Sequence, residues 1–278
     1  MNILGIDFEE WFHPELVKPF VKDKQKDFKV TKGITKILEW LNKNQTFATF
    51  FVVGEIIQKN PEITDLIVDN GHEIGFHTMT HEKLHQIQTR EKFENELKEF
   101  EKITNKKIKG FRAPTFSLDS TTSWAIDSLK KFNYIYDSSV VPVKTKMYGL
   151  PKAKKFPYKI SSDALENIDP KSKLWEFPLM KTKFLGKKIP AGGGFYLRTL
   201  PLKIIKKAIM QYEKEEKPAT FYIHSWELTP EYMPRLKLPI KEKFVTYHNI
   251  DKAFQKMDEL IKKYEFTSFE RHIPNMKN

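Results

Sequence analysis

Cysteine is absent from the 278 residues of the chain, and this absence excludes several kinds of chemistry. Without a thiol, the protein forms no disulfide scaffold, thiolate zinc site or iron–sulfur cluster, and it has no cysteine nucleophile. Any metal ion must therefore be held by His, Asp or Glu side chains. The sequence also lacks a run of about 20 apolar residues, which a membrane-spanning helix needs.

Charge of one sign is nowhere concentrated. Lys and Arg number 48 against 36 Asp and Glu, so the formal charge is +12, but the lysines alternate with glutamates and arginine is scarce. Nucleic-acid-binding proteins usually gather Arg and Lys in a patch or tail, so we expect no nucleic-acid partner. Residues 1–7 lack the basic and apolar regions of a secretion signal, which favours a cytoplasmic location. The oligomeric state cannot be read from the sequence.

Hydrophobic residues make up 40% of the chain, which is ample for a packed core. Short apolar runs alternate with amphipathic stretches, the pattern of parallel strands separated by helices. The expected strands are residues 2–7, 47–53, 72–77, 107–112, 134–140, 174–179, 194–197, 220–224 and 266–269. The expected helices are residues 31–41, 61–69, 90–103, 120–132, 201–212 and 251–264. Seven or eight such units indicate an α/β barrel. We expect one domain over residues 1–278, with an irregular excursion at about 144–170 and a helix-containing C-terminal extension.

Three acidic residues, Asp7, Glu9 and Glu10, follow the first expected strand. Because side chains alternate along a strand, Asp7 and Glu9 should share one face and Glu10 should point to the other. In parallel α/β folds, the carboxyl ends of the strands face the active site. Taken alone, the cluster is also compatible with a solvated acidic loop.

Two histidines, His77 and His81, follow the third expected strand. Placed four residues apart on one helical turn, they would point the same way. With a carboxylate from the neighbouring first strand they form a two-His, one-acid set, which recurs in catalytic zinc sites. Two surface histidines are the simpler alternative.

A second pattern overlaps the first. Residues His81-Glu82-Lys83-Leu84-His85 match the H-E-x-x-H pattern of zinc proteases, which requires one helix through both histidines and Glu82 as base. Here the pattern follows a strand directly, and threonines at 78 and 80 disfavour an earlier helix start. A protease is therefore the weaker hypothesis.

Further polar motifs occur at later strand ends: Arg112-Ala113-Pro114, Tyr136–Ser139, Leu174–Pro178, Gly192–Phe195 and Phe221–Glu227. Read in order, the motifs resemble those of the polysaccharide deacetylase family with its NodB homology domain. Asp7-Phe8-Glu9-Glu10 looks like the first family motif, and His77-Thr78-Met79-Thr80-His81 fits its H-[S/T]-x-[S/T]-H metal motif. Arg112-Ala113-Pro114 and His224 fit later motifs. The resemblance is strongest to a subgroup found with exopolysaccharide or cell-surface glycan clusters.

The resemblance implies a distorted (β/α)7 barrel, a divalent metal ion and hydrolysis of an N-acetyl group on a sugar. The implied ligands are Glu9, His77 and His81, with Glu10 as a rival because the family commonly has aspartate here. A His/carboxylate set suits zinc best, with cobalt, nickel or iron as alternatives. Other implied roles are Asp7 as base, His224 as acid, Arg112 as partner of Asp7, Asp137 as partner of His224, and Trp11, Pro114 and Trp226 as sugar contacts.

The expected substrate is an N-acetylated glycan, a lipid-linked sugar or a nucleotide sugar. Two other functions remain open at this point. One is an allantoinase-like amidohydrolase acting on a small amide, which would need a pocket too narrow for a pyranose ring. The other is a glycan-binding protein without catalysis, although such a protein would need neither Asp7 nor His224.

Overall fold

The computed structural model describes residues 1–22 and 25–276. Its strands are β1 (Asn2–Phe8), β2 (Thr49–Val52), β3 (Glu73–Phe76), β4 (Gly110–Phe111), β5 (Tyr136–Asp137), β6 (Tyr158–Lys159), β7 (Trp175–Glu176), β8 (Lys181–Phe184), β9 (Lys187–Pro190), β10 (Thr220–His224) and β11 (Phe266–Thr267). Its α-helices are α1 (Ile34–Lys43), α2 (Gly54–Lys59), α3 (Glu62–Asp69), α4 (Leu84–Ile87), α5 (Arg90–Thr104), α6 (Trp124–Lys131), α7 (Gly194–Thr199), α8 (Leu202–Lys214), α9 (Ser225–Leu228), α10 (Ile240–Tyr247), α11 (Ala253–Ile261) and α12 (Phe269–His272). Short 3-10 turns include η1 (Lys18–Phe20), η4 (Pro114–Phe116) and η6 (Ile250–Lys252).

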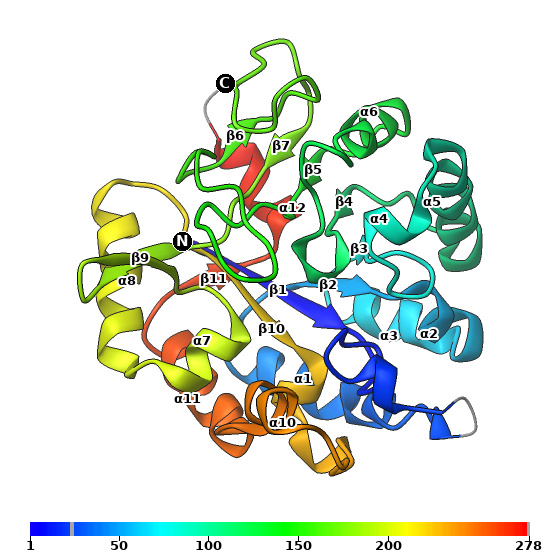
Figure 1. Ribbon diagram of the computed structural model, residues 1–278, viewed down its shortest axis with the longest axis vertical. Coiled ribbons are helices and arrows are strands. Elements are labelled where there is room, and N and C mark those ends of the chain that lie inside the picture. The colour runs from blue at the N-terminus through cyan, green and yellow to red at the C-terminus, as the bar shows by residue number, and fades with distance from the viewer. Residues whose placement is uncertain (23–24, 277–278) are drawn as a thin grey trace.

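Parallel strands form the wall of a barrel in the order β10-β1-β2-β3-β4-β5-β7, and β6 pairs antiparallel with β7 at the edge (Figure 1). The wall closes through a parallel bridge between Leu179, just after β7, and Thr220 of β10. At the same place the amide N of Met180 donates to the carbonyl O of Thr220 at 3.0 Å. Because closure depends on this short contact rather than on paired strands, the barrel is distorted. The expected (β/α)7 barrel is confirmed.

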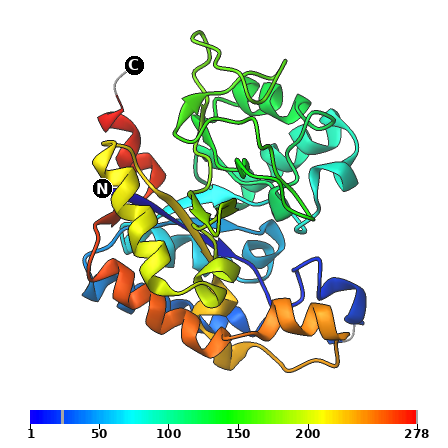
Figure 2. The same ribbon diagram turned by 60° about the vertical axis from the view of Figure 1, so that its left-hand side comes forward.

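Helices cover the outside of the barrel wall (Figures 1 and 2). In α1 the buried residues are Ile34, Ile37, Leu38 and Leu41, whose three- and four-residue spacing gives one apolar face, together with Trp40. Both faces of β1 and β2 are buried, as is typical of strands in a parallel sheet under helices. The core therefore lies between the sheet and these helices.

The C-terminal segment seals one end of the barrel. Strand β11 pairs with the start of β1, and α12 follows with its first residue, Phe269, fully buried. The Phe269 ring stacks on Tyr136, with centroids 4.8 Å apart, and contacts Phe51. These contacts close the end at which the strands begin, so a site inside the barrel can open only at the carboxyl ends of the strands.

A buried carboxyl, Glu73 at the start of β3, fixes this seal. It accepts hydrogen bonds from the hydroxyls of Thr49 (2.5 Å) and Tyr136 (2.7 Å) and from the amide N of Glu270 (3.0 Å) in α12. Burial raises the pKa of Glu73 to about 7, even though these donors act in the opposite direction. Glu73 therefore links three barrel strands to the C-terminal helix.

Several expected elements are wrong in part. The expected strands 107–112, 134–140 and 174–179 form only the two-residue strands β4, β5 and β7. Residues 194–197, expected as a strand, form helix α7, because a short apolar run does not distinguish the two structures. Residues 266–269 form only the two-residue β11 before α12 begins. The excursion at 144–170 consists of turns and β6. Within the described ranges, no helix combines the length and apolar character needed to cross a bilayer.

Candidate active site

The acidic cluster after β1 divides as strand alternation predicts. Asp7 lies beside His224, because β1 and β10 pair in that register. Glu10 turns away, and its carboxylate accepts hydrogen bonds from the backbone amides of residues 29–31 at 2.9–3.1 Å. Glu10 is thus occupied as an anchor for another loop, and the structure brings Glu9 into the site instead.

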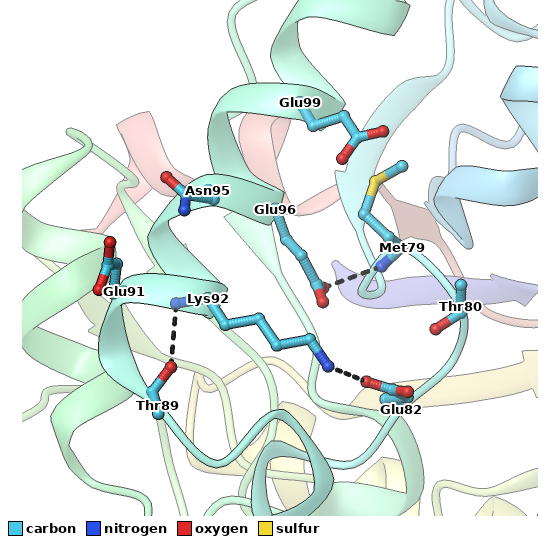
Figure 3. A pocket seen from close by; sticks show the side chains of 9 residues that line it. All are labelled: Met79, Thr80, Glu82, Thr89, Glu91, Lys92, Asn95, Glu96 and Glu99. Carbon is cyan, nitrogen blue, oxygen red and sulfur yellow. Dashed lines mark hydrogen bonds and ion pairs between the residues drawn. The ribbon is translucent and has the colours of Figure 1, made fainter.

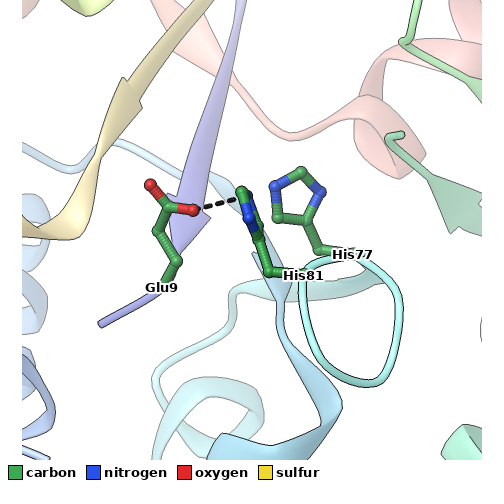
Figure 4. A group of neighbouring side chains, drawn as sticks. All are labelled: Glu9, His77 and His81. Atoms are coloured by element: carbon green, nitrogen blue, oxygen red, sulfur yellow. Dashed lines mark ion pairs between the residues drawn. The ribbon is translucent and has the colours of Figure 1, made fainter. Parts of the chain in front are cut away.

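Glu9, His77 and His81 form a buried cluster (Figure 4). One nitrogen or oxygen from each side chain lies within 4.8 Å of the others. The shortest contact is an ion pair between His81 Nε2 and Glu9 Oε2 at 2.6 Å. The three side chains come from the ends of β1 and β3, as the sequence predicts.

A left-handed loop, rather than a helical turn, brings the two histidines together. Strand β3 ends at Phe76 and α4 begins only at Leu84. Between them, Thr78 and His81 have φ values of 60° and 56°, which ordinary side chains rarely adopt. The expected helical turn is therefore wrong, although the expected pairing of the histidines is correct.

Two helices clamp this loop from behind. The carbonyls of Thr78 and Met79 accept hydrogen bonds from the amides of Gly54 (3.0 Å) and Glu55 (2.8 Å) at the start of α2. The Met79 amide donates to Glu96 of α5 at 3.1 Å, at the wall of an outer hollow of about 550 Å³ (Figure 3). A Cβ at position 54 would lie 2.4 Å from the Met79 Sδ, so a larger residue there would require the Met79 side chain to move. Hydrogen bonds from the α2 backbone and from the Glu96 side chain thus hold the backbone of the strained loop.

A backbone carbonyl determines the tautomer of His77. Its Nδ1 lies 2.7 Å from the carbonyl O of Arg112, which can only accept, so Nδ1 carries the proton. Nε2 therefore keeps its lone pair, as metal-binding histidines usually arrange. Burial lowers the pKa of His77 to about 4, which keeps the ring neutral.

His13 supports His81, a role that the sequence analysis missed. The two rings stack with centroids 5.6 Å apart and an interplanar angle of 11°. His13 Nδ1 accepts from the amide of Glu10 at 3.0 Å, so its Nε2 donates to Glu55 at 2.7 Å. With both nitrogens engaged, His13 is a support for the cluster and not a ligand.

The cluster fits a divalent cation. Apart from the ion pair between Glu9 Oε2 and His81 Nε2, neither Glu9 Oε2 nor His81 Nδ1 has a hydrogen-bond partner among the described residues, although both atoms are buried. Burial alone would raise the pKa of Glu9, but the nearby charges of His81 and His224 hold it below its usual range. One ionised carboxylate and two imidazoles are a donor set typical of zinc.

Arg112 lies beneath the cluster, fully buried. Its Nη1 donates to Asp7 Oδ1 at 2.6 Å, while Nε and Nη2 donate to the carbonyl O and Oγ of Ser138 at 3.0 and 2.9 Å. A Cβ on Gly5 would lie 2.6 Å from Nη1 of Arg112, so only glycine lets β1 come this close to the guanidinium. The expected pairing of Arg112 with Asp7 is present.

His224 is held by Glu227 and not by Asp137. Its Nδ1 lies 2.7 Å from Glu227 Oε2, and Arg198 Nε donates to the other Glu227 oxygen at 2.6 Å. Burial alone would lower the pKa of His224, but the charge of Glu227 raises it to about 9. The spacing of His224 and Glu227 at the N-cap and third position of α9 is a capping pattern that could have indicated this pair.

Asp137 takes a different place. It accepts from the Ser139 hydroxyl at 2.5 Å, and the Ser139 Oγ accepts from the amide of Ala113 at 2.8 Å. Glu176 lies beside it, and both carboxyls are fully buried. Burial, and then the charge of Asp137, raise the pKa of Glu176, so Glu176 keeps a proton that it donates to Asp137. The expected contact of Asp137 with His224 is therefore wrong, and Asp137 stabilises the loop after β4.

A cleft of about 360 Å³ opens above the cluster. Asp7, the three candidate ligands, His224 and Trp226 all line it. Trp226 Nε1 donates to Glu9 Oε1 at 2.8 Å, and its ring stacks on His224. The walls that the sequence analysis missed include Phe116, Lys146, Tyr148, Tyr196, Arg198 and Lys241.

Two expected sugar contacts do not line this cleft. Trp11 is buried in an apolar cluster with Phe12 and Val17, and its Nε1 donates to Asp27. Pro114 is buried, and the following Thr115 and Phe116 line the cleft in its place.

The structure contradicts the zinc-protease hypothesis. Helix α4 begins at Leu84, so no helix carries both His81 and His85. His85 is exposed and pairs with Asp119 at 2.9 Å instead of joining the cluster.

Comparisons with known proteins agree with this geometry. Residues 23–134 match the family model for polysaccharide deacetylase, and residues 138–274 match a domain of unknown function, DUF3473. A peptidoglycan-N-acetylglucosamine deacetylase of Bacillus cereus is 33% identical over 99 residues, which cover 33% of this chain and 35% of the relative. A second such deacetylase of B. cereus is 35% identical over 82 residues, covering 28% and 38%. The chain thus spans little more than a third of the curated relatives it matches.

A solved structure shares the fold. The crystal structure of a putative polysaccharide deacetylase from Mycobacterium smegmatis superposes with a TM-score of 0.56 at 16% identity, covering 99% of this chain and 89% of that one. The chain is therefore similar in sequence to polysaccharide deacetylases over residues 23–134, and it shares its barrel fold with the solved structure over nearly its whole length.

Proposed function

We propose that the protein is a metal-dependent hydrolase that removes N-acetyl groups from sugar units of an N-acetylated glycan. The observation that carries this proposal is the convergence of a Glu/His/His cluster, a carboxylate and a cationic histidine in one cleft. The names of the two B. cereus relatives support the substrate class. The whole of residues 1–278 acts as one catalytic unit, because Asp7 and His224 come from opposite ends of the chain.

Glu9, His77 and His81 would hold the cation, with zinc first and cobalt, nickel or iron as alternatives. Such an ion polarises a carbonyl oxygen and makes water acidic near neutral pH. Neighbouring residues fix the positions of these ligands. The Arg112 carbonyl orients His77 through a hydrogen bond, the His13 ring stacks on His81, and Trp226 donates a hydrogen bond to Glu9.

Asp7 acts as the general base. Asp7 lines the cleft. Among the described side chains, Arg112 donates only to Oδ1 of Asp7, which leaves Oδ2 to face the reacting water. It takes a proton as the water oxygen bonds to the acetamide carbon. Arg112 holds this carboxylate in one orientation through a buried ion pair.

His224 acts as the general acid. Glu227 occupies its Nδ1, so Nε2 is the nitrogen that can face substrate. As the carbon–nitrogen bond breaks, Nε2 gives its proton to the departing sugar amine, and the products are acetate and a free amine. The charge of Glu227 keeps the imidazole protonated for this task.

The assay is acetate release from soluble N-acetylglucosamine oligomers by the purified chain loaded with zinc. We expect turnover that a chelator abolishes and added zinc restores. Asp7→Asn should lower kcat by at least about 100-fold, since general base catalysis contributes about 100- to 10,000-fold. His85→Ala is the matched control, because that exposed histidine lies outside the cluster.

The alternatives give different results. Turnover of allantoin but not of the sugar would assign a small-amide hydrolase. Sugar binding without acetate release under any divalent metal would assign a glycan-binding protein. Full activity of Asp7→Asn would refute the assignment of the base.

A further inference from the structure

The mouth of the cleft carries an unusual surface. Among the large apolar side chains exposed in the described ranges, Phe20, Met147, Ile240 and Phe244 lie on segments that form or flank this mouth. Ile240 is 90% exposed and Phe244, one helical turn later on α10, is 50% exposed. Residues so apolar are rarely left uncovered together without a partner.

These segments form one surface. Figure 2 shows α10 and the segment that contains η1 on the same side of the barrel. Leu236 and Leu238, before α10, pack on the same apolar cluster as Val17 and Val21, which flank η1. Phe244 contacts Phe195, a wall of the cleft, and Lys146 and Met147 line the cleft from another loop. We call Phe20, Lys146, Met147, Lys237, Ile240, Lys241, Lys243 and Phe244 the basic apolar rim.

The charge of the basic apolar rim is one-sided. Lys146, Lys237, Lys241 and Lys243 are exposed, and none of the four forms an ion pair among the described residues. Glu242 is the one carboxylate between Lys241 and Lys243. Because lysines surround exposed apolar side chains, the rim complements an anionic surface that also has an apolar layer.

Hydrogen bonds hold helix α10 in place, so its exposed face has a defined orientation. The Arg198 guanidinium, itself buried, donates to the carbonyls of Val245, Thr246 and His248 at the end of the helix. The helix therefore presents Ile240 and Phe244 outward in a fixed orientation rather than as a loose segment.

We propose that the basic apolar rim docks the protein on a membrane surface rich in anionic lipid headgroups. Two other occupants fit less well. A second copy of the chain in a two-fold interface would place these lysines against each other. A glycan chain stacks on flat aromatic rings, whereas Ile240 and Met147 are aliphatic.

Docking itself does not depend on the proposed deacetylase function. Where that function holds, docking turns the cleft towards glycans carried at the membrane, because Lys241 belongs to both the rim and the cleft wall. The substrate class is then a membrane-borne N-acetylated glycan.

The test is co-sedimentation of the full chain with vesicles of phosphatidylcholine mixed with phosphatidylglycerol, and with vesicles of phosphatidylcholine alone. We expect binding to the mixed vesicles that weakens as salt is raised. Lys237→Gln with Lys243→Gln should weaken it by about fivefold for each lysine. Ile240→Glu with Phe244→Glu should weaken it by more than about tenfold, since two apolar side chains no longer enter the interface.

Met210→Glu on α8 is the matched control, because Met210 is 57% exposed but lies away from the mouth, and it should bind as the parent does. Asp7→Asn should also bind normally, which separates docking from activity. The Ile240→Glu/Phe244→Glu variant should still release acetate from soluble oligomers, which shows that it is folded.

Equal binding of the protein to both kinds of vesicle overturns the proposal. Unchanged binding of the Ile240→Glu/Phe244→Glu variant to the mixed vesicles also overturns it. Retention on insoluble chitin that these substitutions abolish, without vesicle binding, reassigns the rim to a glycan and also overturns it.

Discussion

Replacing Glu73 by glutamine should make the protein less sensitive to alkaline pH. The Glu73 carboxyl lies in the sealed end of the barrel, where burial raises its pKa from 4.5 to about 7. The folded state therefore holds a proton between these values that the unfolded chain releases. Its contribution to stability is complete below about pH 4.5 and is lost as the pH rises through about 7. The glutamine variant carries no such proton.

The size of the effect follows from the pKa. Each tenfold change in proton affinity is worth about 1.4 kcal/mol, so a rise from 4.5 to about 7 corresponds to about 3 kcal/mol. Between pH 4.5 and 8, the free energy of unfolding of wild type should fall by this amount relative to Glu73→Gln. Glutamine has nearly the same shape and can still accept from Thr49 and from the amide of Glu270, so packing should be preserved.

The measurement is urea unfolding of both proteins across this pH range, with chelator present so that metal loss does not contribute. Taking the difference between the two proteins cancels every other titrating group. A difference that stays constant with pH would refute the reasoning, since it would mean that Glu73 ionises as readily in the folded state as in the unfolded one.

The remaining predictions concern the site. His77→Ala should abolish both acetate release and zinc binding by calorimetry, while His85→Ala keeps both, and the reverse result would revive the protease hypothesis. Arg112→Lys should lower the unfolding free energy by about 3 kcal/mol and acetate release by at least about tenfold, because lysine cannot reproduce buried forked bonds; a wild-type profile would contradict the role of the ion pair. Glu176→Gln should change the midpoint of urea unfolding little, since the amide can donate to Asp137 as the protonated carboxyl does, and a large loss would show that Glu176 is ionised.

Local patterns in the sequence predicted the barrel and the strand ends at which the site residues lie. The apolar run at the start of the chain and the alternation of Asp7, Glu9 and Glu10 are local features, and side-chain alternation follows from strand geometry alone. The carboxyl ends of parallel strands meet at one end of a barrel. A carboxylate of the first strand and the His77–His81 pair could therefore be placed together without coordinates, whereas Glu9 in particular was implied by the family resemblance.

Contacts between distant segments could not be predicted in the same way. His13 and Glu55 are 42 residues apart, and no local pattern indicates that their side chains meet behind His81. Asp137 was the expected partner of His224, but Glu227 takes that place, and the outcome depends on how the walls of the barrel close. Trp11 was expected to contact the sugar, but it is buried in an apolar cluster, and burial depends on the tertiary structure.

The left-handed loop between His77 and His81 escaped prediction for a different reason. Positive φ values in threonine and histidine cost free energy, so sequence patterns argue against them. Here the bonds from α2 and Glu96 hold the backbone in place, and these partners come from other parts of the chain. Strain of this kind is typical of functional sites and is recognised only after the surroundings are known.

The first strand has its neighbours at opposite ends of the chain. Strand β1 pairs with β10 on one side, and on the other side with β11 at its start and β2 further along; β10 and β11 come more than 200 residues later. At ribosomal rates of about 5–20 residues per second, the segment bearing Glu9 leaves the exit tunnel roughly 10–40 seconds before β10 is made. During that interval β1 has an unpaired edge and Glu9 lacks its hydrogen bond from Trp226, so a nascent chain can bring its two histidines together but cannot complete the candidate metal site. Slow synthesis or early termination would therefore yield a chain with an exposed sheet edge, the feature that chaperones and aggregation both recognise.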